Sequence, residues 1–157
     1  MSTSPSRSPR RPKRQDSSPE QAVVEGVVKG LGQLLKFIFG RGGKGGGQNN
    51  EQLQKIRSLW PAVEGHLAQE STYALAVSEA DKLLDSALQA TGIAGESMGE
   101  RLKASQQTFP VSLYQDIWDA HKLRNHLAHE MGATVDKAEA QQAVRTFRSA
   151  LQHLTVL

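Results

Sequence analysis

Apolar residues from position 51 onward recur every three to four positions, and no segment alternates between apolar and polar residues as a half-buried strand would. This period predicts helices that each bury one face. The expected helices cover residues 51–69, 71–91, 97–107, 112–132 and 135–157. Because the connections between them are short, the sequence predicts an all-α fold, an antiparallel bundle of about five helices.

Local signals refine the ends of these helices. Pro61 lies inside the first one, and a kink or break is expected just before it because proline lacks the backbone N–H that a helix uses. Gly92 is expected to close the second helix. Ser97 and Ser112 each stand three residues before a Glu or Gln, which is the capping-box pattern, and should open the third and fourth helices.

Three further segments precede the helical domain expected over residues 51–157. Residues 1–22 are rich in Ser, Pro and Arg with almost no apolar side chains, so they are predicted to be a disordered basic tail. Residues 40–50 contain six glycines and are expected to form a flexible linker. Residues 23–39 predict an amphipathic helix, whose three charged side chains share one narrow stripe.

The amphipathic helix Val23–Phe39 has two candidate roles. Its broad apolar face beside charged residues suits peripheral contact with a membrane surface. Alternatively, it docks on the protein's own bundle or on a second copy. The segment is too short and too charged to span a membrane, and no secretion cleavage site follows it. A cytoplasmic protein is therefore expected, with peripheral membrane contact as the open alternative.

Charge is divided unevenly along the chain. Residues 1–50 carry nine Lys/Arg and three Asp/Glu, whereas residues 51–157 carry ten and thirteen. The helical part is therefore mildly acidic, and a general basic face for RNA is excluded there. If this part handles RNA, it does so through a small local site or with help from the tail. The absence of cysteine excludes disulfides and thiolate metal sites and fits a reducing compartment.

The fourth expected helix places polar residues where a core is expected. On a helical wheel, Arg124 lies in the middle of the apolar stripe that should face the core. The stripe consists of Leu113, Ile117, Ala120, Leu123, Leu127 and Met131. A second stripe beside it consists of Tyr114, Trp118, His121, Asn125 and His129. His126 falls on the opposite, solvated face.

Three interpretations of these stripes remain open. In the first, Arg124 is structural: its guanidinium cannot shed its charge, so it pairs inside the fold with Asp81, Asp85 or Glu100. In the second, His121, Asn125 and His129, at i, i+4 and i+8, converge on one metal ion. That set offers only two good ligands, both histidines, with no evident third, so no metal is expected.

The third interpretation is a phosphate-directed site. Arg124 would bind a phosphate through its planar fork, and His129 would transfer protons. Asn125 would orient a hydroxyl group or the imidazole ring.

The segment Arg124-Asn125-x-x-x-His129 resembles the R-x(4–6)-H signature of HEPN domains, in the RNxxxH form that many members carry. It also lies where those domains place it, late in the penultimate long helix of an α-helical bundle. The resemblance covers residues 51–157. The motif is short, and its context adds the specificity: an all-helical chain, an aromatic and His stripe, and a closing amphipathic helix.

The resemblance implies a metal-independent endoribonuclease without a cofactor, acting as a homodimer on single-stranded RNA in one shared cleft. His129 would be the general base on the ribose 2′-hydroxyl, Arg124 would stabilise the transition state, and Asn125 would position the substrate or the histidine. His121, Trp118 and Tyr114, outside the signature, would line the cleft or support it, with His121 behind His129.

The family also implies alternatives. It includes inactive members, small-molecule binders, and toxins that are paired with a nucleotidyltransferase antitoxin. The alternative function is therefore a catalytically inactive helical module for protein interaction or nucleotide binding, to which the amphipathic residues 23–39 would add the peripheral membrane contact considered above.

Overall fold

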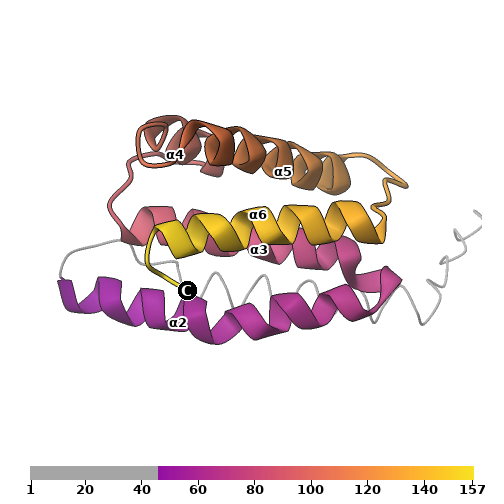
Figure 1. Cartoon of the computed structure of the whole chain (residues 1–157), viewed down its shortest axis with the longest axis horizontal. Helices are drawn as coiled ribbons and strands as arrows, with labels where there is room; N and C mark the ends of the chain where they lie inside the picture. Colours follow the sequence, from indigo (N-terminus) through magenta and orange to yellow (C-terminus); the bar gives the residue numbers. More distant parts are fainter. Residues whose placement is uncertain (1–45) are drawn as a thin grey trace, which may run out of the picture. The chain divides into compact units, whose positions relative to one another are not determined.

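The computed structural model describes residues 46–157; the tail and helix predicted over 1–22 and 23–39, and the start of the linker, lie outside the described residues. The described part consists of α-helices and two short 3-10 turns, without strands. In chain order these are α2 (Gly46–Gly65), η1 (His66–Ala68), η2 (Glu70–Thr72), α3 (Tyr73–Ala90), α4 (Met98–Ala104), α5 (Val111–His129) and α6 (Lys137–His153). The predicted all-α bundle is confirmed (Figure 1). None of the helices within 46–157 has the length and apolar character needed to cross a bilayer.

Helix α3 is the centre of the bundle. It packs against α2, α5 and α6, and α5 also packs against α6. Twelve of its 18 residues are buried, more than one stripe requires, because neighbours cover it on several sides. All five helices within residues 46–157 contribute to the core, whose largest fully buried side chains include Ile56, Leu84, Leu88, Leu102, Ile117, Phe147 and Leu151.

Two of the predicted helix ends are confirmed. Gly92 follows α3 with a φ of 85°, the left-handed conformation that glycine adopts without strain. The N–H groups of Gly92 and Ile93 donate to the carbonyls of Gln89 and Leu88, which completes a Schellman motif. At the start of α4, the Ser97 side chain accepts a hydrogen bond from the backbone N–H of Glu100 at 3.3 Å.

Two other boundaries differ from the prediction. Helix α2 begins at Gly46, inside the expected linker, and continues through Pro61 to Gly65 without a break. Pro61 is exposed, so the carbonyl that it deprives of a partner can be solvated, while the buried side chains of Trp60 and Val63 hold the helix against the bundle. Helix α5 begins at Val111, directly after Pro110, so Ser112 lies inside the first turn and caps nothing.

The core stripe predicted for the fourth helix is only partly correct. Ile117 and Ala120 are buried, and Leu113, Leu123 and Leu127 are half-buried, but Met131 is fully exposed. The wheel fails at Met131 because α5 ends two residues earlier, at His129.

A partly shielded acid–base pair joins the α2–α3 connection to α3. His66 Nε2 lies 3.2 Å from Glu79 Oε2, and the Glu79 side chain is 7% exposed. Burial raises the pKa of the Glu79 carboxyl above its ordinary value of 4.5, although His66 and Lys82 oppose this shift. The other carboxyl oxygen, Oε1, is buried without a hydrogen-bond partner.

This raised pKa predicts a pH dependence of stability. The folded state binds the Glu79 proton more tightly than the unfolded chain, so protonated Glu79 contributes stability that is fully present below pH 4.5 and is lost as pH rises through the folded pKa. Glu79→Gln, which cannot ionise, should remove this part of the loss. Urea unfolding of both proteins from pH 4 to 7 checks it: parallel stability curves would contradict the prediction.

Candidate functional site

The Arg124 side chain is paired within the fold. Its Nε lies 3.3 Å from Oδ2 of Asp81, which projects from α3; the Arg124 side chain is 25% exposed and that of Asp81 only 1%. A buried carboxylate requires a positive counter-charge, and a guanidinium that cannot deprotonate requires a negative one, so each group neutralises the other. The structural interpretation of Arg124 therefore describes a contact that is present, and Asp81 is the partner among the three candidates.

The other two candidate acids have partners of their own. Asp85 accepts from Arg101 at both carboxyl oxygens, from Nε at 2.6 Å and from Nη2 at 3.2 Å. The hydrogen bond to Asp85 raises the pKa of Arg101. Glu100 accepts from the backbone N–H of Glu96 at 2.7 Å. Their engagement leaves Asp81 to pair with Arg124.

His121 and Asn125 close this ion pair into a ring of contacts. His121 is buried, and its Nδ1 lies 2.7 Å from Asp81 Oδ1. Its Nε2 lies 3.1 Å from Asn125 Nδ2, and Asn125 Oδ1 accepts from Arg124 Nη1 at 2.9 Å. We call Asp81, His121, Arg124 and Asn125 the polar quartet. Each member contacts two others, so none of the four side chains is oriented independently.

Helical spacing explains why three of these residues meet. Positions 121, 124 and 125 stand at i, i+3 and i+4, so they share one face of α5 within a single turn. Asp81 comes from the buried face of α3 that packs on α5. The contact between Asp81 and His121 was missed in the sequence. Its signal is an acid at position 81, three and four residues from the apolar Leu84 and Val77.

Aromatic rings continue from the quartet toward the start of α5. Tyr114 and Trp118 meet edge to face with their ring centroids 6.3 Å apart, and Trp118 meets His121 in the same way at 6.0 Å. Tyr114 is buried and Trp118 half-buried. Tyr114 is therefore a core residue rather than part of an open cleft, and Trp118 packs against the His121 ring.

His129 lies apart from the quartet. It is the last residue of α5 and is exposed, and no side-chain hydrogen bond or ion pair joins it to another residue within 46–157. His126 is also exposed, as predicted, and its ring lies 2.9 Å from Glu130. The structure thus brings together Arg124, Asn125 and His121, while His129 remains accessible at the helix end. The sequence stripe that contained both His121 and His129 divides into a buried and an exposed part.

The metal interpretation gains no support from these contacts. Both ring nitrogens of His121 are engaged, one by Asp81 and one by Asn125. Within residues 46–157, no three His, Cys, Asp or Glu side chains lie close enough to hold a metal ion. His121, Asn125 and His129 therefore do not converge as one ligand set.

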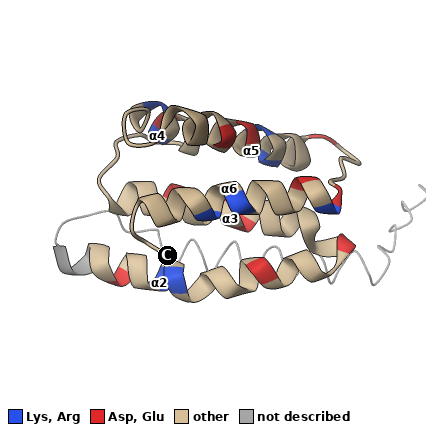
Figure 2. Cartoon of the chain, viewed as in Figure 1, with Lys and Arg blue, Asp and Glu red and all other residues tan. Residues whose placement is uncertain are grey.

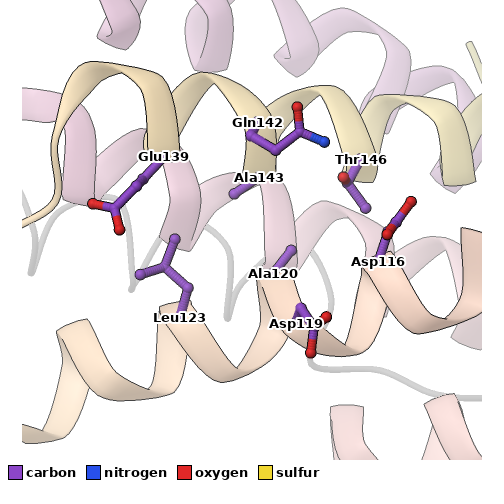
Figure 3. A pocket seen from close by; sticks show the side chains of 8 residues that line it. All are labelled: Asp116, Asp119, Ala120, Leu123, Glu139, Gln142, Ala143 and Thr146. Carbon is purple, nitrogen blue, oxygen red and sulfur yellow. The ribbon is translucent and has the colours of Figure 1, made fainter.

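A groove of about 300 Å³ lies between α5 and α6 and shares no residue with the quartet (Figure 3). Its lining comprises Asp116, Asp119, Ala120, Leu123, Glu139, Gln142, Ala143 and Thr146. With three carboxylates and no Lys or Arg, this groove repels a phosphate backbone. Across the described helices, Lys and Arg are interspersed with Asp and Glu rather than gathered in one stripe (Figure 2). Within residues 46–157, the phosphate-directed interpretation therefore rests on Arg124 rather than on a general basic face.

Comparisons of the chain with protein-family models, curated proteins and solved structures found no match. The motif in α5 and the contacts of its side chains are then the basis for assigning a function.

Proposed function

We propose that this chain is a metal-independent endoribonuclease of HEPN type that acts as a homodimer on single-stranded RNA. One observation carries the proposal: Arg124 is held in a fixed orientation by Asp81 and Asn125, yet a quarter of its side chain remains exposed, on the helix that ends at the accessible His129. A positioned cation and a titratable ring are the two groups that cleavage of a phosphodiester beside a 2′-hydroxyl requires.

The contacts of Arg124 leave donors for a substrate. A guanidinium has five N–H groups. Asn125 Oδ1 accepts a hydrogen bond from one of them at Nη1, and Nε faces Asp81 Oδ2 at 3.3 Å as an ion pair. The guanidinium N–H groups outside these contacts are the ones that can bind a phosphate oxygen. Asn125 acts in this proposal by holding Arg124, in addition to the substrate-positioning role that the resemblance implies.

The proposed reaction needs two copies of the chain. His129 takes the proton of the ribose 2′-hydroxyl, and the 2′ oxygen forms a bond to phosphorus. The bond from phosphorus to the 5′ oxygen breaks, and the partner subunit's His129, in its protonated form, supplies a proton to that oxygen. The products are a 2′,3′-cyclic phosphate and a 5′-hydroxyl. Arg124 stabilises the extra negative charge on the phosphate oxygens between these steps.

A cleavage assay tests this function. The full chain is incubated with a single-stranded RNA in the presence of EDTA, beside a 2′-O-methylated RNA of the same sequence as the matched control. We expect cleavage of the unmodified strand only, leaving 2′,3′-cyclic phosphate ends. Cleavage of the methylated strand, or loss of activity in EDTA, would contradict the mechanism.

A second candidate function is favoured by the Arg124–Asp81 pair. The same contacts that orient Arg124 also neutralise it, as expected if the motif locks α5 to α3 in a catalytically inactive helical module. Such a module would bind a protein partner or a nucleotide. A nucleotidyltransferase antitoxin, and peripheral membrane contact through residues 23–39, remain predictions from the sequence.

A further inference from the structure

We infer that His121 and Asp81 are positioning residues that hold Arg124 in place only while His121 is neutral with its proton on Nδ1. The assignment starts from Arg124, which can only donate hydrogen bonds, and therefore requires the Oδ1 of Asn125 to face it, as it does at 2.9 Å. The Asn125 amide must then present its Nδ2–H to His121, whose Nε2 at 3.1 Å has to accept.

The remaining contacts agree with this assignment. If Nε2 accepts, the proton of a neutral imidazole lies on Nδ1, which faces Asp81 Oδ1 at 2.7 Å. Asp81 Oδ2 receives Arg124 Nε. At each of the four contacts of the quartet a donor or cation then faces an acceptor, and the charges of Asp81 and Arg124 cancel. The opposite tautomer of His121 would point one N–H at the Asn125 amide donor and leave a lone pair facing the Asp81 carboxylate.

Addition of one proton to His121 removes one contact of the quartet, the hydrogen bond between Asn125 and Arg124. A protonated Nε2 needs an acceptor, so the Asn125 amide has to turn and offer its oxygen to His121. Its NH₂ group then faces Arg124 Nη1, donor against donor, and that hydrogen bond is lost. The quartet changes from neutral to a net charge of +1, and Arg124 keeps only its contact with Asp81.

The groups that face His121 come from two helices. Asp81 lies on α3, and Arg124, Asn125 and the Trp118 ring lie on α5 itself. Within residues 46–157, no ion pair connects Asp81, His121 or Arg124 to a charged group of α4 or α6. The bond between Asn125 and Arg124 is therefore the contact that responds to the proton.

The consequence for RNA rests on the proposed function. A released Arg124 in a cluster of charge +1 attracts a phosphate more strongly but orients it less well. Acid would then favour binding of a phosphodiester over its cleavage. The positioning role itself does not depend on catalysis and is measured without RNA.

Nitrogen-15 spectra of the histidine rings of the full chain test the inference. At neutral pH, His121 should give a pyrrole-like Nδ1 and a pyridine-like Nε2. His153 is the internal control, because its Nε2 lies 2.8 Å from the Thr108 carbonyl and must be the protonated nitrogen when the ring is neutral. On acidification, the Arg124 Nη–H signals, which report the bond to Asn125, should shift together with the His121 ring. A His121 that is protonated on Nε2 at neutral pH, or an Arg124 signal that ignores the His121 titration, overturns the inference.

The substitution Asn125→Asp should produce a His121 ring that is protonated on both nitrogens at neutral pH. A carboxylate at this position can accept from both Arg124 and Nε2–H, so both His121 nitrogens should become pyrrole-like at neutral pH while Arg124 stays held. Acidification should then no longer shift the Arg124 signal. An unchanged His121 spectrum in this variant would contradict the assignment. The spectra are recorded without RNA, so they are independent of the cleavage assay. A protein that gives the expected spectra but does not cleave RNA refutes only the nuclease proposal. A protein that cleaves RNA but lacks these spectra refutes only this inference.

Discussion

Asp81→Ala should lower the free energy of unfolding by about 3–5 kcal/mol, the usual cost of removing one partner from a buried ion pair. The Asp81 side chain is 1% exposed and receives both Arg124 and His121. Without it, the buried Nδ1–H of His121 has no acceptor and the Arg124 charge loses its counterion. Urea denaturation of the two proteins at neutral pH measures the difference.

Asp119→Ala is the matched control for this substitution. Asp119 forms an ion pair with Lys122 at 3.0 Å, but the two side chains are 73% and 70% exposed. Exposed pairs of this kind contribute about 0–1 kcal/mol, because water and salt screen them. Similar losses in both variants would show that the quartet contributes no more than a surface ion pair. Asp81→Asn should fall between the two, because its amide can accept from His121 but presents an NH₂ group to Arg124.

Under the proposed function, His129→Ala should lower the rate of RNA cleavage by about 10²–10⁴-fold, the range that a general base contributes. The stability of the protein should not change, because His129 is exposed at the end of α5 and has no side-chain hydrogen bond within residues 46–157. Initial cleavage rates in EDTA, together with urea unfolding of the same preparations, measure both effects.

His126→Ala serves as the control for His129. It removes another exposed histidine from the last turn of α5 and should leave cleavage nearly unchanged. Arg124→Ala is a less specific probe, since it destabilises the fold through Asp81 as well as removing the proposed phosphate contact. If His129→Ala cleaves as fast as the unmodified protein, the nuclease assignment is wrong, and the interaction module becomes the preferred function.

The sequence predicted the helices well because their signals are local. The three-to-four-residue period depends only on which side of a helix is buried, and the Gly92 and Ser97 signals act within one turn of backbone. The sequence was less reliable where tertiary packing or the end of a helix overrode a local rule. Pro61 was expected to break a helix that packing keeps intact, and Met131 was assigned to a core from which the end of α5 excludes it.

The candidate site also has a part that the sequence predicted and a part that it did not. That Arg124 needs a partner followed from its position in an apolar stripe, because a guanidinium keeps its charge. Which of three acids would meet it did not follow. Arg101 on α4 engages Asp85 on α3, a contact that spacing along the chain does not give, whereas Glu100 accepts from the backbone of Glu96 within its own turn.

The sequence by itself determined the helical period, the helix ends at Gly92 and Ser97, and the presence of a misplaced cation beside a polar stripe. The packing of α3 on α5 decided that Asp81 receives both Arg124 and His121, and that His121 is buried while His129, on the same stripe, is exposed. A helical wheel gives the angle of a side chain around its axis. Burial also depends on how far along that axis the neighbouring helix extends, which is a property of the assembled bundle.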